Sequence, residues 1–99
     1  MVPVADSLYE AISSYDLDAV NRFIESGVDV NAKLNKAKTP LKVAVDRHAV
    51  KIGRALIKNG ADVHTRHNGA TLLHDAAKAG DLGFTKLLLE SGVSRNVKD

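Results

Sequence analysis

The sequence contains no cysteine, which excludes a disulfide framework and a thiolate zinc site. Small secreted domains often depend on disulfides, so we expect a cytoplasmic protein. Aromatic residues are also scarce, at 4% of the 99 residues, so any core must consist of Ala, Val, Leu and Ile. Residues 1–6 have no basic segment and no long apolar run, unlike a signal peptide. No apolar run approaches the length of a membrane span.

The sequence also lacks a large excess of one sign of charge, because 14 Lys and Arg residues nearly balance 12 Asp and Glu residues and leave a net charge of +2. A balance this small does not by itself indicate nucleic-acid binding. The hydrophobic fraction of 44% and the charged fraction of 26% are ordinary for a folded globular chain, and they exclude intrinsic disorder. The length suits a single domain spanning residues 1–99.

An internal repeat is the strongest pattern in the sequence. A glycine recurs after 33 and then 32 residues, at Gly27, Gly60 and Gly92. An alanine recurs with the same two spacings, at Ala11, Ala44 and Ala76. Two independent markers with one period predict three repeats, at approximately 6–33, 34–65 and 66–98.

Each repeat is predicted to contain a short helix, a turn, a second helix and a loop. The first helices are expected near 7–14, 40–47 and 72–79, and the second near 17–26, 50–58 and 82–91. Thr39 and Thr71 are suited to cap two of the first helices, with Pro40 in the first helical position. Asp6 occupies the matching position in the first repeat. Gly27, Gly60 and Gly92 are expected to end the second helices in the left-handed conformation.

The apolar residues of both helices follow the spacing of an amphipathic helix. Small residues face inward on the first helices, which lets neighbouring helices approach closely. These inward positions are Leu8, Ala11, Ile12, Leu41, Ala44, Val45, Leu73, Ala76 and Ala77. The apolar positions of the second helices are Leu17, Val20, Phe23, Ile24, Val50, Ile52, Ala55, Leu56, Ile57, Leu82, Phe84, Leu87, Leu88 and Leu89.

The sequence resembles the ankyrin repeat over residues 6–98. The resemblance rests on the period, on Thr-Pro-Leu at residues 39–41, on Thr-Leu-Leu-His at 71–74, and on Gly-Val-Asp-Val-Asn-Ala at 27–32 with Gly-Ala-Asp-Val at 60–63. It implies an all-α solenoid of three helix-turn-helix repeats with hairpin-like loops. A single repeat cannot bury its apolar face alone, so stacking is expected to create the core.

Several positions depart from the family pattern. Lys42 stands where the family usually has histidine, and Ala37 replaces the usual turn glycine that Gly69 keeps. Tyr15 and His48 stand where the third repeat has Gly80. These departures make the turns less regular without changing the expected fold. His74 keeps the family's histidine, which the resemblance assigns a structural role.

The resemblance also implies that the protein is a protein–protein interaction scaffold and not an enzyme. Family members bind partners through the tips of the loops, here called fingers, and through the exposed face of the first helices. Ser13, Ser14 and Ala79 belong to that face. The partner-binding positions expected here are Lys33, Asn35, Lys36, Lys38, Asp46, Arg47, Arg66, His67, Asn68, Ala70 and Lys78.

The fingers are more basic than the rest of the chain. Residues 31–38, 63–70 and 93–99 together carry a net formal charge of +5, whereas the whole chain carries +2. Exposed ion pairs contribute little to folding, so we expect this charge to face an acidic patch on a partner protein. No aromatic residue lies among these positions for base stacking, so nucleic acid is not the expected partner. No membrane partner is expected either.

Residues of this sequence also suggest two other functions, metal binding and catalysis. Asp62, His64 and His67 are close in sequence and suggest a metal site, but no fourth ligand is evident. Catalytic pairs can be drawn from Glu10 with Ser13 or Ser14, from Asp46 with His48, and from His74 with Asp75. The expected groove is open to water, and the sequence has no nucleophile elbow, Walker motif or zinc signature. A hydrolase or metal-binding protein is therefore the weakest alternative, and no cofactor is expected.

The carboxyl-terminal face of the array suggests a further contact. Leu87 is expected to be poorly protected there, whereas natural end repeats usually present a polar outer face. Further repeats or self-association are therefore expected at this end. The second alternative for function is a small stand-alone inhibitor, antitoxin-like or host-directed, that blocks an enzyme by covering it.

Overall fold

The computed structural model describes residues 4–34, 38–64, 66–67 and 70–91, and it shows helix pairs stacked side by side. The first pair consists of α1 (Val4–Ser13) and α2 (Leu17–Glu25), and the second of α3 (Pro40–Asp46) and α4 (Val50–Lys58). The third consists of α5 (Leu72–Lys78) and α6 (Leu82–Glu90). The predicted all-α repeat fold is confirmed.

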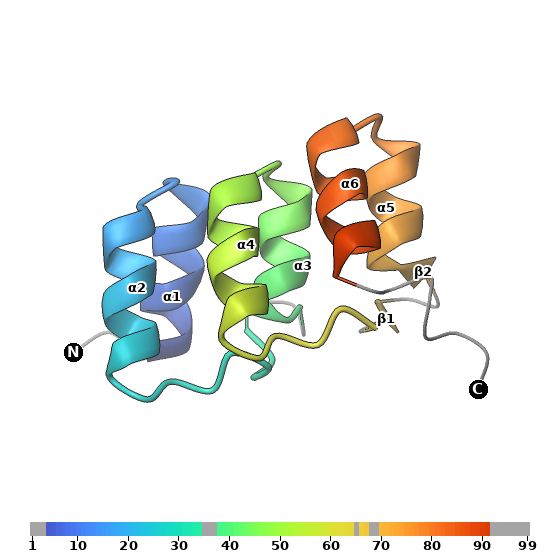
Figure 1. Cartoon of the computed structure of the whole chain (residues 1–99). Helices are drawn as coiled ribbons and strands as arrows, with labels where there is room; N and C mark the ends of the chain where they lie inside the picture. The colour runs from blue at the N-terminus through green and yellow to red at the C-terminus, as the bar shows by residue number, and fades with distance from the viewer. Residues whose placement is uncertain (1–3, 35–37, 65, 68–69, 92–99) are drawn as a thin grey trace.

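The helices form two layers along the stack (Figure 1). The first helices of the pairs, α1, α3 and α5, contact one another in sequence, and the second helices α2, α4 and α6 do the same. Two very short strands, β1 (Arg66–His67) and β2 (Ala70–Thr71), pair antiparallel between the second and third helix pairs. They form the only sheet in the described part of the chain.

The helix ends follow from local chemistry. The side chains of Thr39 and Thr71 cap α3 and α5 by accepting hydrogen bonds from the backbone N–H groups of Lys42 and His74, as predicted. The prediction for Asp6 was wrong: α1 begins at Val4, so Asp6 lies inside its first turn and cannot stand before the helix as its cap.

Two of the predicted glycine terminators behave as expected. Gly27 and Gly60 have φ values of 94° and 101°, in the left-handed region that other residues rarely adopt. Gly92 lies outside the described residues.

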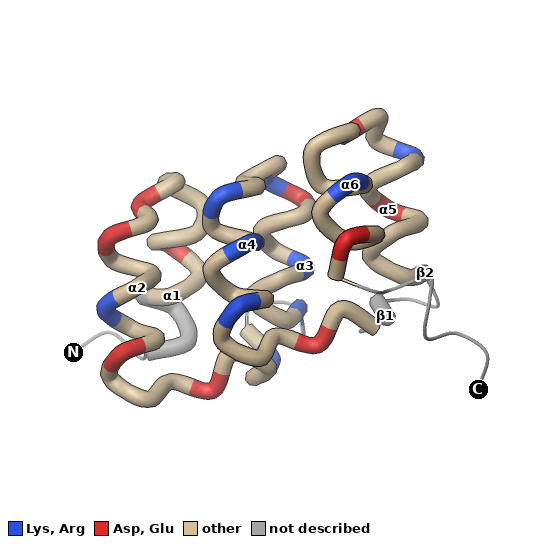
Figure 2. Tube along the Cα trace, viewed as in Figure 1, with Lys and Arg blue, Asp and Glu red and all other residues tan. Residues whose placement is uncertain are grey.

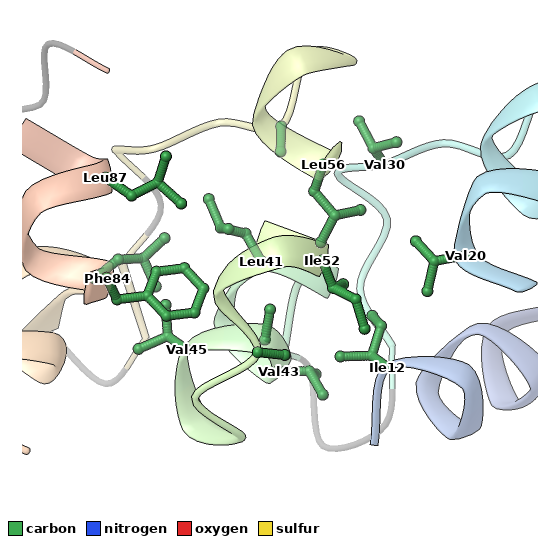
Figure 3. Packing of buried hydrophobic residues seen from close by; sticks show 14 of the residues in the cluster. Ile12, Val20, Val30, Leu41, Val43, Val45, Ile52, Leu56, Phe84 and Leu87 are labelled. Atoms are coloured by element: carbon green, nitrogen blue, oxygen red, sulfur yellow. The ribbon is translucent and has the colours of Figure 1, made fainter. Parts of the chain in front are cut away.

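The core lies between neighbouring helix pairs, as stacking requires (Figure 3). Residues of α3 are buried on several sides because α1, α4 and α5 all pack around that helix. Ala44 is fully buried there, as expected for a small residue at a close helix contact. The labelled side chains in Figure 3 that fill this core are Ile12, Val20, Val30, Leu41, Val43, Val45, Ile52, Leu56, Phe84 and Leu87.

The third helix pair corrects two expectations. The prediction that Leu87 is poorly protected was wrong, because its side chain is only 4% exposed. The exposed leucines of α6 are Leu82, at 80%, and Leu89, at 41%. On α5, Leu73 is half-buried and Ala77 is exposed, whereas Leu72 is fully buried. Helix α5 contacts α3 on one side only, which explains why some of its apolar positions remain partly exposed.

Candidate functional site

The predicted finger positions divide into those that the structure describes and those that it does not. Asn35, Lys36 and Asn68 lie outside the described residues. The backbones of Arg66, His67 and Ala70 belong to the short hairpin, where Arg66 pairs with Thr71 and His67 with Ala70. The side chains of these three hairpin residues also lie outside the description. The geometry of the site therefore rests on the first finger and the first-helix layer.

The first finger is fixed at its base by contacts with the second repeat. The side-chain amide of Asn31 donates to the carbonyl oxygen of Gly60 at 3.1 Å, and its oxygen accepts from the backbone N–H of Asp62 at 2.7 Å. Closer to the tip, the Leu34 N–H donates to the carbonyl of Lys38, and Leu34 is buried. These contacts hold the two loops in one register, so the finger bases form a defined surface.

An ion-pair network covers part of the first-helix face. Lys42 Nζ donates to Asp46 Oδ1 at 2.8 Å on its own helix and to Asp75 Oδ2 at 2.7 Å on α5. Lys38 Nζ donates to the other oxygen of Asp46 at 2.7 Å. The position that departs from the family's histidine is therefore a buried cation that links the second and third repeats.

The pKa values in this network follow from its contacts. Burial alone lowers the pKa of Lys42, but hydrogen bonds to Asp46 and Asp75 outweigh that effect and raise the pKa above its ordinary value. Burial raises the pKa of Asp46, and hydrogen bonds from Lys38 and Lys42 outweigh it, so this pKa lies below its ordinary value. The charged forms of these groups stabilise one another across the repeat boundary.

The network changes how the predicted site residues are interpreted. Lys38 and Asp46 were both expected to face a partner, and in the structure they bind each other. Sequence spacing alone did not reveal this, because Asp46 lies in the next helix, outside the loop whose charge was counted. The charge that Lys38 gives the finger is therefore compensated within the chain.

Lys33, Arg47 and Lys78 are the exposed cations on this side of the described chain. Lys33 and Lys78 have no side-chain partner among the described residues. The Arg47 guanidinium beside Tyr9 lowers the pKa of that phenol. The backbone carbonyl of Arg47 accepts a hydrogen bond of 2.8 Å from Tyr15. Lys33 and Lys78 are thus the cations most available to a partner.

The residue pairs considered for catalysis do not meet as acid and base. Asp46 binds two lysines, and His48 instead places Nδ1 2.9 Å from Asp81 Oδ2. Asp75 is held by Lys42. The Ser13 hydroxyl is buried, and Ser14 is exposed. These contacts are those of a repeat interface.

The described side chains contain no group of three His, Asp or Glu residues that could hold a metal ion. His64 is exposed, and its backbone N–H donates to Asp62 Oδ1 at 2.8 Å. The same turn occurs one repeat earlier, where the Asn31 N–H donates to Asp29 Oδ1 at 2.8 Å. The Asp62 and His64 pair is thus accounted for by the repeated turn.

The turns between paired helices contain a feature that sequence reasoning located but did not interpret. Tyr15, His48 and Gly80 all have positive φ values, of 59°, 57° and 73°. The Tyr15 hydroxyl reaches the turn of the second repeat, and the His48 imidazole reaches the turn of the third. The two departures from glycine therefore supply bonds between neighbouring turns.

Helix pairs stacked with a period of about 33 residues and joined by finger loops define an ankyrin-type array. A family model described as ankyrin repeats in three copies matches residues 8–99. The chain belongs to the ankyrin repeat family. Ankyrin repeats generally mediate protein–protein interactions, and the family is typically a non-enzymatic interaction module.

Similar proteins come from diverse organisms. The chain is 38% identical over 85 residues to delta-latroinsectotoxin-Lt1a of Latrodectus tredecimguttatus, covering 83% of this chain and 7% of the toxin. It is 33% identical over 91 residues to the ankyrin repeat protein FPV014 of fowlpox virus, covering 91% and 21% of the two chains. It is 27% identical over 95 residues to the mouse B-cell lymphoma 3 protein homolog, covering 94% and 21%. The chain thus spans about a fifth or less of these relatives.

No helix in the described part of the chain is long and apolar enough to cross a membrane.

Proposed function

We propose that this chain is a protein-recognition scaffold that binds an acidic surface of a partner protein through its fingers and the exposed face of α1, α3 and α5. The observation that carries the proposal is the hydrogen-bonded register of the finger bases, in which Asn31 bridges to Gly60 and Asp62. A surface fixed before binding loses little conformational entropy when a partner docks. The cytoplasmic location expected from composition remains a prediction.

The described cations that support this proposal are Lys33, Arg47 and Lys78, because Lys38 and Lys42 bind carboxylates of the chain itself. Complementary charge mainly raises the association rate, and salt screens this effect. Charge reversal at Lys38 would place a glutamate against Asp46 and destabilise the fold, so a loss of binding in that variant could not be assigned to the surface. The informative double variant is therefore Lys33→Glu with Lys78→Glu.

The test compares the wild type, this double variant and the control Lys86→Glu, which reverses an exposed cation on α6. Each protein is immobilised, and the proteins retained from an extract of the encoding organism are quantified. We expect at least one protein to bind wild type and the control but not the double variant, with an association rate that falls as salt increases. Equal retention and equal salt dependence for all three would refute the proposed surface.

A small inhibitor that covers an enzyme would use the same surface. This second candidate predicts that the captured partner is an enzyme and loses activity on binding. A partner that remains active in the complex would favour the scaffold.

A further inference from the structure

The opposite side of the stack carries a second basic surface, along α4. Helix α4 exposes Lys51, Arg54 and Lys58, spaced by three and then four residues, which places them along one face of the helix. Figure 2 shows the basic positions along α4 without an acidic position among them, whereas α2 and α6 carry both signs. None of these three cations has a side-chain partner within the described structure.

The three cations border a groove between α2 and α4 with a volume of about 460 Å³. Helix α2 contributes Leu17 and Asn21 to its lining, and Ala55 and Asn59 complete it, so no carboxylate lines the groove. A neighbouring hollow of about 330 Å³ shares Leu17 and Lys51 with the groove. The hollow is more apolar, being lined also by Tyr15, His48, Ala49, Val50 and Ile52. The two form one continuous surface, basic along α4 and apolar at its amino-terminal end.

Helix stability does not explain this arrangement. Like charges at these spacings repel one another. Lys51 lies in the first turn of α4, where the helix dipole disfavours a cation, and the residue before the helix, Ala49, provides no side-chain cap. Only Lys58, in the last turn, is favourably placed. Attraction of an anionic partner accounts for all three cations together.

The spacing selects the kind of partner. Seven residues of helix rise by about 10 Å, so the three cations extend over two turns of α4. Carboxylates on one face of a partner helix recur at the same distances. The lining of the basic groove contains no aromatic side chain on which a nucleic-acid base could stack. We propose that this groove binds an acidic amphipathic helix of a protein partner, with an apolar side chain of that helix in the hollow beside Tyr15 and His48.

The probe for this proposal is a labelled helical peptide of about 15 residues, the length at which an isolated helix becomes marginally stable. It carries glutamates at positions i, i+3 and i+7 and a leucine one turn before the first glutamate. The control peptide has the same composition with its glutamates distributed around the helix. Binding is measured by fluorescence anisotropy at low and physiological salt, and the site is mapped by changes in amide NMR signals.

We expect the patterned peptide to bind with signal changes in α2 and α4, more tightly than the control peptide and more weakly at higher salt. The variant Lys51→Glu with Arg54→Glu and Lys58→Glu is expected to weaken binding by about tenfold or more. Its circular dichroism should match wild type, because the exposed positions keep the same like-charge spacing. Replacing the peptide's leucine with alanine should also weaken binding.

The variant Lys33→Glu with Lys78→Glu is the control for overall charge, because it reverses two exposed cations on the finger side and should weaken peptide binding much less than the groove variant. Its behaviour separates failure of this groove from failure of the proposed function. The inference is overturned if the control peptide binds equally well, if the signal changes lie on the fingers, or if no peptide binds at low salt. Tighter binding of a single-stranded oligonucleotide of equal charge would also overturn it.

Discussion

Gly53 lies at a close contact between the second and third repeats, and its replacement tests the packing directly. It is buried within α4, facing the fully buried ring of Phe84 on α6. A methyl group added at Gly53 would lie 2.5 Å from Phe84 Cε1 and nearer still to Cζ. Real side chains do not approach so closely, so either the ring or the helix must move.

Two opposing effects determine the result of Gly53→Ala. Alanine favours a helix interior over glycine by about 0.8–1.0 kcal/mol. Overpacking a well-filled core costs about 1–3 kcal/mol, and Phe84 has no exposed surface into which it can move. We expect the clash to prevail and Gly53→Ala to lower the free energy of unfolding by roughly 1–2 kcal/mol.

The sign of the effect should reverse when the ring is removed. The atoms nearest the added methyl are Cζ, Cε1 and Cε2 of Phe84, all of which leucine lacks. Phe84→Leu is expected to destabilise the protein by itself, but Gly53→Ala in that background should stabilise it by roughly 0.5–1 kcal/mol. Urea unfolding of the four proteins measures this cycle. The comparison is Gly83→Ala in α6, where the nearest atom, Val50 Cγ2, would be 3.2 Å away and needs to move only slightly, so this variant should lose less stability than Gly53→Ala. If Gly53→Ala changes stability equally in both backgrounds, the described packing is wrong.

Three further predictions concern the repeat boundaries. Ala44→Leu adds volume at a fully buried position and should lower the free energy of unfolding by ~1–3 kcal/mol in urea, whereas an unchanged midpoint would contradict the register. Lys42→Met leaves Asp75 without its cation and should cost about 1–3 kcal/mol, less than for a deeply buried pair because Asp75 is 21% exposed; no loss would show that the bridge is dispensable. The pKa values of Asp46 and Asp81 lie below the ordinary 3.8, so their stabilisation is present at neutral pH and should be lost as pH falls below that value. Asp46→Asn should therefore reduce the loss of stability on acidification, and an identical pH profile would refute its role.

The helical array was predictable because its signals are local and repeated. Glycine and alanine markers give the period, and Thr39 and Thr71 give helix starts whose caps the structure confirms. The start of α1 was not predicted correctly, because aspartate is favoured both as a helix cap and in the first helical turn, so Asp6 fits either position. The exposure of Leu82 and Leu89 was missed because their spacing fits an apolar stripe although they are not covered in the structure.

The candidate site was less predictable because its contacts join residues in different repeats. Counting the charges of a loop cannot show that Lys38 will meet Asp46, or that Lys42 will reach Asp75 on the next helix. The basic face of α4 is a contrasting case, since the spacing of Lys51, Arg54 and Lys58 is visible in the sequence. The resemblance to the ankyrin family does not point to this face, because the partner-binding positions that it implies lie on the fingers and the first helices.

The two residues that replace glycine in the turns, Tyr15 and His48, adopt a strained backbone conformation and bond to the neighbouring repeat. A left-handed conformation costs a residue other than glycine roughly 1–2 kcal/mol, so glycine would be the less strained choice for Tyr15 and His48. Glycine, however, would remove the bond from Tyr15 to Arg47 and the bond from His48 to Asp81. Because a repeat protein's stability depends on interactions between neighbours, these bonds strengthen the interfaces between the repeats. Gly80, at the same position in the third turn, has no side chain with which to make such a bond. Backbone strain in these turns therefore occurs at Tyr15 and His48, the two residues whose side chains bond to the following repeat.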